Sequence, residues 1–219
     1  SFSGTHSEYD PLFSPDGASL YFSSERPVND SSPEGHTHIW RIERTTSGWG
    51  EPIHVPLTGR GDYFSSITTT GDIYFNTWNT GEILKATATD SGYQISALPE
   101  FINSRSDAGD AFISPNEEYL IYRSYYNDGY GRGDLYISFK VNDEWTAPEN
   151  LGEPINSQGH EMCPFVTTDG KMFIFASDRM ADYYTSKDLE GLKQKFQSYD
   201  NGQLNIYYMS ADFIDKMKA

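Results

Sequence analysis

The chain has 219 residues, of which 37% are apolar and 15% aromatic, with 19 glycines and 11 prolines. This composition excludes a disordered chain, because such a chain would leave its large aromatic surface exposed to water. It favours strands joined by turns. The formal charge of −16 disfavours nucleic acid and anionic lipid as partners, and the longest apolar run, Met172–Ala176, is too short to cross a bilayer.

Four segments with one pattern predict a repeated strand unit. Each is a short apolar strand that ends in a turn of Asp-Gly, Thr-Gly or Asn-Glu type. They cover residues 10–17, 64–71, 110–117 and 163–170. The equivalent residues Ser14, Thr68, Ser114 and Thr167 are separated by 54, 46 and 53 residues. Repeats of about 40–50 residues are typical of propeller blades.

Further strands follow in each repeat, and we name the four strands A to D from hub to rim. Strands A and B are almost continuously apolar, as expected of strands buried on both faces, whereas C and D carry more charge. Strand B is expected at 20–23, 73–75, 120–122 and 172–176, strand C at 38–42, 82–85, 134–138 and 205–209, and strand D near 49–55, 93–98 and 145–151.

These patterns predict an all-β fold, a β-propeller of four-stranded antiparallel blades in a single domain, 1–219. The expected blades are 8–56, 62–101, 108–152 and 161–219. The fourth repeat shows no strand D, and the chain opens within a D-to-A connector. We therefore expect an upstream segment with at least one more blade, and five blades in total. A four-bladed ring with a short last blade, or a ring of six or more blades, are the alternatives.

The connections between strands B and C vary as those of a binding face do. Blade one inserts 25–37, blade three 125–133 and blade four 180–204. In blade three, Tyr125, Tyr126 and Tyr130 either contact a sugar or peptide or fold onto the disc. In blade four, the apolar residues Leu189, Leu192 and Phe196 predict a short amphipathic helix, either a lid or brace on the disc or a partner-binding helix.

Strand alternation places the D–A connectors and the B–C loops on one face of the disc. The carboxylates Glu8, Asp62, Asp110 and Glu161 lie at the hub ends of the blades and are candidate catalytic residues in a central funnel, as acid and base or nucleophile in glycoside chemistry. Asp62, Asp110 and Glu161 are weak candidates for a Ca²⁺ site. The alternative is that such acids cap strand ends and accept bonds from neighbouring N–H groups. Asp107 belongs to the same connectors.

Three arginines, Arg26, Arg123 and Arg179, occupy near-equivalent positions at the end of strand B. They could grip a carboxylate or phosphate of a ligand. Alternatively, each pairs with an acid on an adjacent connector and so links blades. The candidate ligand-binding residues are Asp10, Arg26, Arg123, Tyr125, Tyr126, Tyr130, His160 and Arg179.

No cofactor is expected apart from a possible Ca²⁺ in the tunnel. His36-Thr-His38 would place two imidazoles on one strand face but has no third ligand by sequence. The single cysteine, Cys163, lies in an apolar-leaning stretch and is expected to be a buried structural thiol. No phosphate loop, zincin helix or nucleophile elbow is present.

The run 10–26, Asp-Pro-Leu-Phe-Ser-Pro-Asp-Gly-Ala-Ser-Leu-Tyr-Phe-Ser-Ser-Glu-Arg, resembles the WD40-like (PD40) repeat of TolB-type β-propellers, and 167–179 and 205–209 match it again. Repeat three has Pro115-Asn116 in place of Pro-Asp-Gly, and repeat two, with 69–71 as Thr-Thr-Gly, departs most. The resemblance implies a propeller whose hosts range from envelope proteins that bind other proteins to enzymes acting on sugars or peptides. It also implies a periplasmic or secreted location.

Three hypotheses about function follow. The first is a non-catalytic binding propeller of the bacterial cell envelope that presents its D–A and B–C face to a protein or glycan. The second is a carbohydrate-active enzyme, a glycoside hydrolase or lyase, with carboxylates in the funnel. The third is a structural repeat domain of a larger protein.

Overall fold

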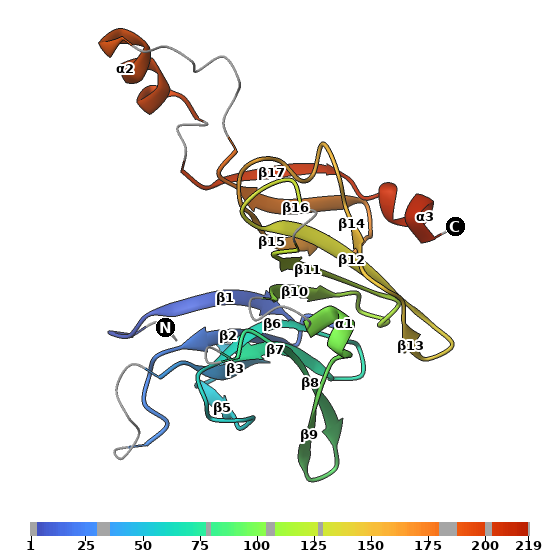
Figure 1. Cartoon of the computed structure of the whole chain (residues 1–219). Coiled ribbons are helices and arrows are strands. Elements are labelled where there is room, and N and C mark those ends of the chain that lie inside the picture. Colours follow the sequence, from blue (N-terminus) through green and yellow to red (C-terminus); the bar gives the residue numbers. More distant parts are fainter. Residues whose placement is uncertain are drawn as a thin grey trace.

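The structure, a computed structural model, describes residues 4–29, 36–77, 80–103, 108–126, 129–179, 188–199 and 203–218. These residues form four antiparallel β-sheets that follow one another along the chain as the blades of a propeller (Figure 1). The all-β propeller predicted from the repeats is therefore confirmed. No helix within the described ranges has the length and apolar character that a bilayer span requires.

Each sheet runs outward from strand A at the hub, in the predicted order. Blade one contains β1 (Glu8–Phe13), β2 (Ser19–Ser24), β3 (His38–Thr45), β4 (Gly48–Trp49) and β5 (Ile53–Val55). Blade two contains β6 (Asp62–Ile67), β7 (Ile73–Thr77), β8 (Ile83–Thr89) and β9 (Gly92–Ala97). Blade three contains β10 (Gly109–Ile113), β11 (Tyr119–Ser124), β12 (Asp134–Val141), β13 (Glu144–Trp145) and β14 (Glu149–Asn150). Blade four contains β15 (Glu161–Val166), β16 (Met172–Ser177) and β17 (Asn205–Ser210).

Strand D differs from the prediction in blades one and three. There it consists of two short pieces, β4 with β5 and β13 with β14, and all of them pair with strand C. Pro52 and Pro148 lie between the pieces and have no N–H to donate to the ladder. Blade two has no proline within β9, and its strand D is continuous. Blade four has the three strands predicted for it within the described ranges.

Three helices accompany the sheets within the described residues. The helix predicted in the blade-four insertion is α2 (Leu189–Gln197), but it stands away from the sheets (Figure 1) with the side chains of Leu189, Leu192 and Phe196 exposed. The expectation of a lid or brace on the disc is therefore wrong for this structure. The short helices α1 (Glu100–Asn103) and α3 (Phe213–Lys218) were not predicted, and each buries an isoleucine, Ile102 and Ile214, in a core between blades.

Alternate residues of strand B face opposite neighbours, and this fixes how the blades pack. The middle residue of the strand, Tyr21 in blade one, faces the next blade, whereas its two flanking residues face the previous one. The resulting cores join Tyr21 to Ile73 and Phe75, Tyr74 to Leu120 and Tyr122, and Ile121 to Phe173 and Phe175. The strand C residues Ile39, Ile83 and Leu135 complete the three cores.

Candidate functional site

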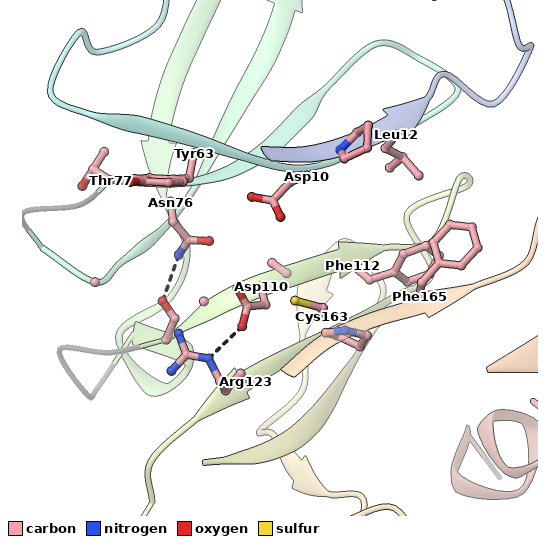
Figure 2. A pocket seen from close by; sticks show the side chains of 16 residues that line it. Asp10, Leu12, Tyr63, Asn76, Thr77, Asp110, Phe112, Arg123, Cys163 and Phe165 are labelled. Atoms are coloured by element: carbon pink, nitrogen blue, oxygen red, sulfur yellow. Dashed lines mark hydrogen bonds and ion pairs between the residues drawn. The ribbon is translucent and has the colours of Figure 1, made fainter. Parts of the chain in front are cut away.

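A cavity of about 610 Å³ lies at the hub, where the innermost strands of the four blades meet (Figure 2). Blade one contributes Asp10 and Leu12, blade two contributes Asn76, blade three contributes Asp110 and blade four contributes Cys163. Its volume falls within the range of about 300–1,000 Å³ that small-molecule sites occupy.

A repeated β-bulge directs side chains into this cavity. In strands A of blades one, three and four, the pairing with strand B shifts register across two residues, between Tyr9 and Leu12, Gly109 and Phe112, and Met162 and Phe165. The first residue within each shift, Asp10, Asp110 or Cys163, has a left-handed backbone with φ of 50°, 52° and 51°. Bulges of this kind re-aim a side chain, and non-glycine residues in this region carry strain that gathers at functional sites. The second blade shifts register in a different way, between Phe64 and Ser66.

Asp10, Asp110 and Cys163 influence one another electrostatically across the cavity (Figure 2). Asp10 lines the cavity and is exposed there. Burial, with a smaller contribution from the charge of Asp110, raises the pKa of Asp10 to about 6. Burial and the two carboxylates raise the pKa of the Cys163 thiol to about 12. The thiol is exposed to the cavity, so the expectation of a fully buried cysteine is wrong.

The two hub aspartates have different partners. Asp110 Oδ2 accepts a hydrogen bond from Arg123 Nε at 2.8 Å, and the Arg123 guanidinium lies over the Tyr125 ring, 5.1 Å from its centre. The Asp10 carboxylate makes no hydrogen bond or ion pair with the part of the chain that the structure describes. Asp110 is therefore charge-compensated by a neighbour, whereas Asp10 is available to a ligand.

The cavity has a polar and an apolar side (Figure 2). Asn76 lies on the polar side and donates through Nδ2 to the Ala108 carbonyl at 2.8 Å. On the apolar side lie Leu12, Phe112 and Phe165, with the two phenylalanine rings packed edge to face at 5.6 Å. A ligand that combines a polar group with an apolar body would match both sides.

Three of the four candidate catalytic carboxylates do not line the cavity. Glu8, Asp62 and Glu161 are each the first residue of a strand A, and in blades one and four this is two residues before the bulge residue. Asp62 accepts bonds from the backbone N–H groups of Thr58 at 3.0 Å and Gly59 at 2.9 Å. These acids cap strand ends, as the alternative interpretation predicted, and only Asp110 reaches the cavity. Asp107 lies outside the described residues.

Glu161 is fully buried, with 0% of its surface exposed. Its Oε1 accepts bonds from Ser157 Oγ and Ser177 Oγ, both at 2.6 Å, and lies 3.4 Å from Arg179 Nη2. A carboxylate held in this way fixes the start of β15 rather than meeting a ligand.

Each of the three arginines at the end of strand B pairs with an acid, as one of the two interpretations predicted. Arg26 binds Glu8 at 2.9 Å, and its guanidinium lies over the rings of Phe22 and Trp40. Each arginine pairs with an acid of its own blade rather than of a neighbouring blade. The prediction that these pairs link blades is therefore wrong. Arg179 also donates from Nη1 to the Pro154 carbonyl at 2.7 Å. Of the three, only Arg123 lines the cavity.

The aromatic B–C loop of blade three mostly folds onto the disc. Tyr125 Oη lies 3.3 Å from His160 Nε2, and Tyr126 Oη donates to the Phe101 carbonyl at 2.7 Å. Burial and the nearby Arg123 lower the pKa of His160. Tyr130 is 49% exposed. Tyr130 is thus the loop tyrosine that a partner could reach.

No three His, Cys, Asp or Glu residues within the described ranges are arranged to hold a metal ion. Asp62 and Glu161 are separated from the cavity that Asp110 lines. His36 and His38 line a second cavity of about 380 Å³ together with His54. Burial lowers the pKa of both His38 and His54.

The sequence analysis named Asp10 and Asp110 as candidates but expected Cys163 to be buried, and it did not recognise that the three occupy one equivalent position. Asp10, Asp110 and Cys163 each precede the equivalent Ser or Thr of their repeat by four residues. That shared offset was the available signal, because one offset in equivalent strands means one place at the hub.

No protein-family model matches the chain, and no curated protein matches it in sequence. Solved structures do match. An α-L-arabinanase of Penicillium chrysogenum aligns with a TM-score of 0.50 and 11% identity over 91% of this chain and 61% of that one. A Bacteroides uniformis protein described as a candidate 6-phosphogluconolactonase aligns with a TM-score of 0.42 and 16% identity over 78% of this chain and 47% of that one. The chain thus spans about half the length of such proteins, and at these identities the likeness shows the fold alone.

Proposed function

We propose that this chain is a ligand-binding β-propeller whose ligand enters the hub from the face of the D–A connectors and B–C loops. One observation carries the proposal: a single cavity is lined by the innermost strands of all four blades, and three of these strands direct a left-handed bulge residue into it. The ligand is a glycan or the exposed end of a protein chain. The resemblance of the repeats to TolB-type propellers supports a place in the bacterial cell envelope.

Binding rather than catalysis fits the charge arrangement. Three of the four candidate catalytic carboxylates are satisfied away from the cavity, and the fourth, Asp110, is paired with Arg123. A catalytic pair requires two carboxylates that are both available to one substrate, whereas Arg123 engages Asp110. A binding site tolerates an acid that a neighbour neutralises.

The sole cysteine provides a direct test, because a methanethiosulfonate reagent at elevated pH can modify only Cys163 and would place its thioalkyl group in the cavity. Oligosaccharides and peptides are screened by native mass spectrometry. We expect some of these ligands to bind the unmodified chain but not the modified chain. The same ligands should still bind the Cys163→Ala variant after treatment with the reagent. Binding that persists after Cys163 modification but disappears in Tyr130→Ala would place the site on the loop and contradict the proposal.

A carbohydrate-active enzyme is the second candidate, and one observation favours it. Asp10 and Asp110 face one cavity in unlike environments, with the pKa of Asp10 raised to about 6 and Asp110 held by Arg123. Such a divergence is typical of an acid and base pair.

The variants Asp110→Ala and Glu161→Ala separate the two candidates. Under the binding proposal both mainly lower the melting temperature. Unchanged melting of Asp110→Ala together with lost turnover of a glycan would favour the enzyme.

A further inference from the structure

The charge of the hub cavity indicates what kind of ligand it takes. We propose that the cavity binds an organic cation, an ammonium group joined to an apolar body, with Asp10 as the counter-ion. This inference rests on the proposed function of the cavity as a ligand site and names the ligand class for it.

Among the hub carboxylates, Asp10 is the one without a compensating partner in the described part of the chain. Glu8, Asp110 and Glu161 are each paired with an arginine, and backbone N–H groups bind Asp62. With Arg123 balancing Asp110, the lining of the cavity carries a net charge of about −1 from Asp10. A ligand cation would complete the compensation that the other hub acids already have.

Backbone geometry fixes the direction of Asp10. Its left-handed φ of 50° within the bulge turns the side chain into the cavity rather than along the strand. The raised pKa of Asp10 agrees with this placement, because burial disfavours its charged form and, to a smaller extent, the nearby charge of Asp110 opposes a second negative charge. A bound ammonium would relieve that repulsion.

The remainder of the cavity suits an apolar body. Leu12, Phe112 and Phe165 form one side of it (Figure 2), and the ring of Tyr63 also lines it. An aromatic ring beside a carboxylate adds a favourable contact for an ammonium group. The cavity therefore offers charge at one point and apolar surface elsewhere.

An anionic ligand fits poorly. Arg123 is the one cationic side chain among the lining residues that the structure describes, and it is engaged by Asp110 and the Tyr125 ring. The formal charge of −16 also repels anions and attracts cations to the molecule.

A matched pair of probes tests the inference: 2-phenylethylamine, a cation at neutral pH, and 2-phenylethanol, its neutral counterpart. Binding of both is measured by calorimetry at pH 7.5. We expect the amine to bind about tenfold more tightly or better, as a hydrogen bond to a charged group would provide. We also expect its affinity to fall as the pH is lowered through about 6, where Asp10 becomes protonated, whereas the affinity of the alcohol should not change.

Variants locate the effect. Asp10→Asn should remove the preference for the amine and leave alcohol binding unchanged, and asparagine tolerates the left-handed backbone, so folding is preserved. Asp143→Asn is the control. It removes the same charge from a fully exposed residue that also has a left-handed backbone, in the turn between β12 and β13, and it should change the affinity of neither probe. Equal binding of the two probes, or an amine preference that survives Asp10→Asn, would overturn the cation inference while leaving the cavity as a ligand site. Failure of both probes at millimolar concentration, with no ligand lost on Cys163 modification, would overturn the proposed function itself.

Discussion

Blades one to three and blade four differ at residues that occupy the same register position. Ile39, Ile83 and Leu135 on strand C are each 0% exposed. They lie opposite the strand B residue that follows the apolar run in their blades, namely Ser23, Asn76 and Arg123. Their equivalent in blade four, Ile206, lies opposite Ala176 and is 78% exposed. The side chains are alike, so the presence of a following blade, rather than residue type, makes this position a core.

The outer face of blade one shows another solution. Leu20, Phe22, Trp40 and Ile42 lie on its far side from blade two and are nevertheless buried. Val28, from the blade's own B–C insertion, packs against them, and Arg26 lies over two of the rings. The insertion of blade four instead carries α2, whose apolar side chains are exposed.

The largest expected effect comes from truncating one member of each class. Leu135→Ala should lower the free energy of unfolding by about 2–5 kcal/mol, because it leaves a cavity in a buried core. Ile206→Ala should change it by no more than about 0.5 kcal/mol, as exposed substitutions do. Urea denaturation of both variants measures the difference. Equal losses would show that the outer face of blade four is covered in solution and would break the comparison.

Blade four is nonetheless anchored firmly at the hub. Glu161→Ala should destabilise the fold by about 3 kcal/mol, because it leaves Arg179 and two serine hydroxyl groups without their buried acceptor. The matched variant Glu8→Ala removes the equivalent acid of blade one, which is partly exposed and should cost about 1 kcal/mol. Thermal unfolding ranks the two, and a larger loss for Glu8→Ala would contradict the assignment.

An ion network reinforces the contact between blades two and three. Glu117 accepts from Tyr74 Oη and from Lys140 Nζ, both at 2.5 Å, and also binds Lys85. Burial opposes its ionisation, but these partners outweigh burial and lower the pKa of Glu117 to about 2. Its folded pKa lies below its ordinary 4.5, so this stabilisation is present above about pH 4.5 and is lost as the pH falls toward 2.

Glu117→Gln should therefore cost about 1–2 kcal/mol at pH 7 and less at pH 3. Glu117→Gly serves as a control, because Glu117 has φ of 61°, where the other three blades have Gly17, Gly71 and Gly170. Glycine would remove both the strain and the network, so a variant as stable as the wild type would show that the network stabilises the fold only by as much as the strain destabilises it. Stability curves from pH 2 to 7 provide the measurement.

The smallest effect concerns Asp10, whose folded pKa of about 6 lies above its ordinary 3.8. Between these values the folded chain binds a proton that the unfolded chain has released, so stability falls slightly as the pH rises from about 4 to about 6. Asp10→Asn should remove that slope. Melting temperatures of both forms across this range test it, and identical slopes would show that Asp10 titrates normally.

The repeat period and the turn residues were sufficient to predict the fold, because both are local. The split of strand D could have been predicted from Pro52 and Pro148. The apolar pattern continues across both prolines and therefore suggested one continuous strand. The site was harder to predict. Glu8, Asp62 and Glu161 have the same residue chemistry as Asp10 and Asp110, and only a two-residue offset and a bulge decide which of them faces the cavity. Ion pairs within a blade depend on side-chain directions that spacing alone does not specify.

The bulge shared by strands A of three blades also bears on how such a chain can diversify. The backbone conformation at the bulge directs the side chain into the cavity whatever its chemistry. Asp10, Asp110 and Cys163 have nearly the same φ there. A substitution there leaves the pairing of strands A and B intact. Copies of one ancestral repeat could therefore change their central residues one blade at a time, and ligand preference could diverge without a new fold at each step.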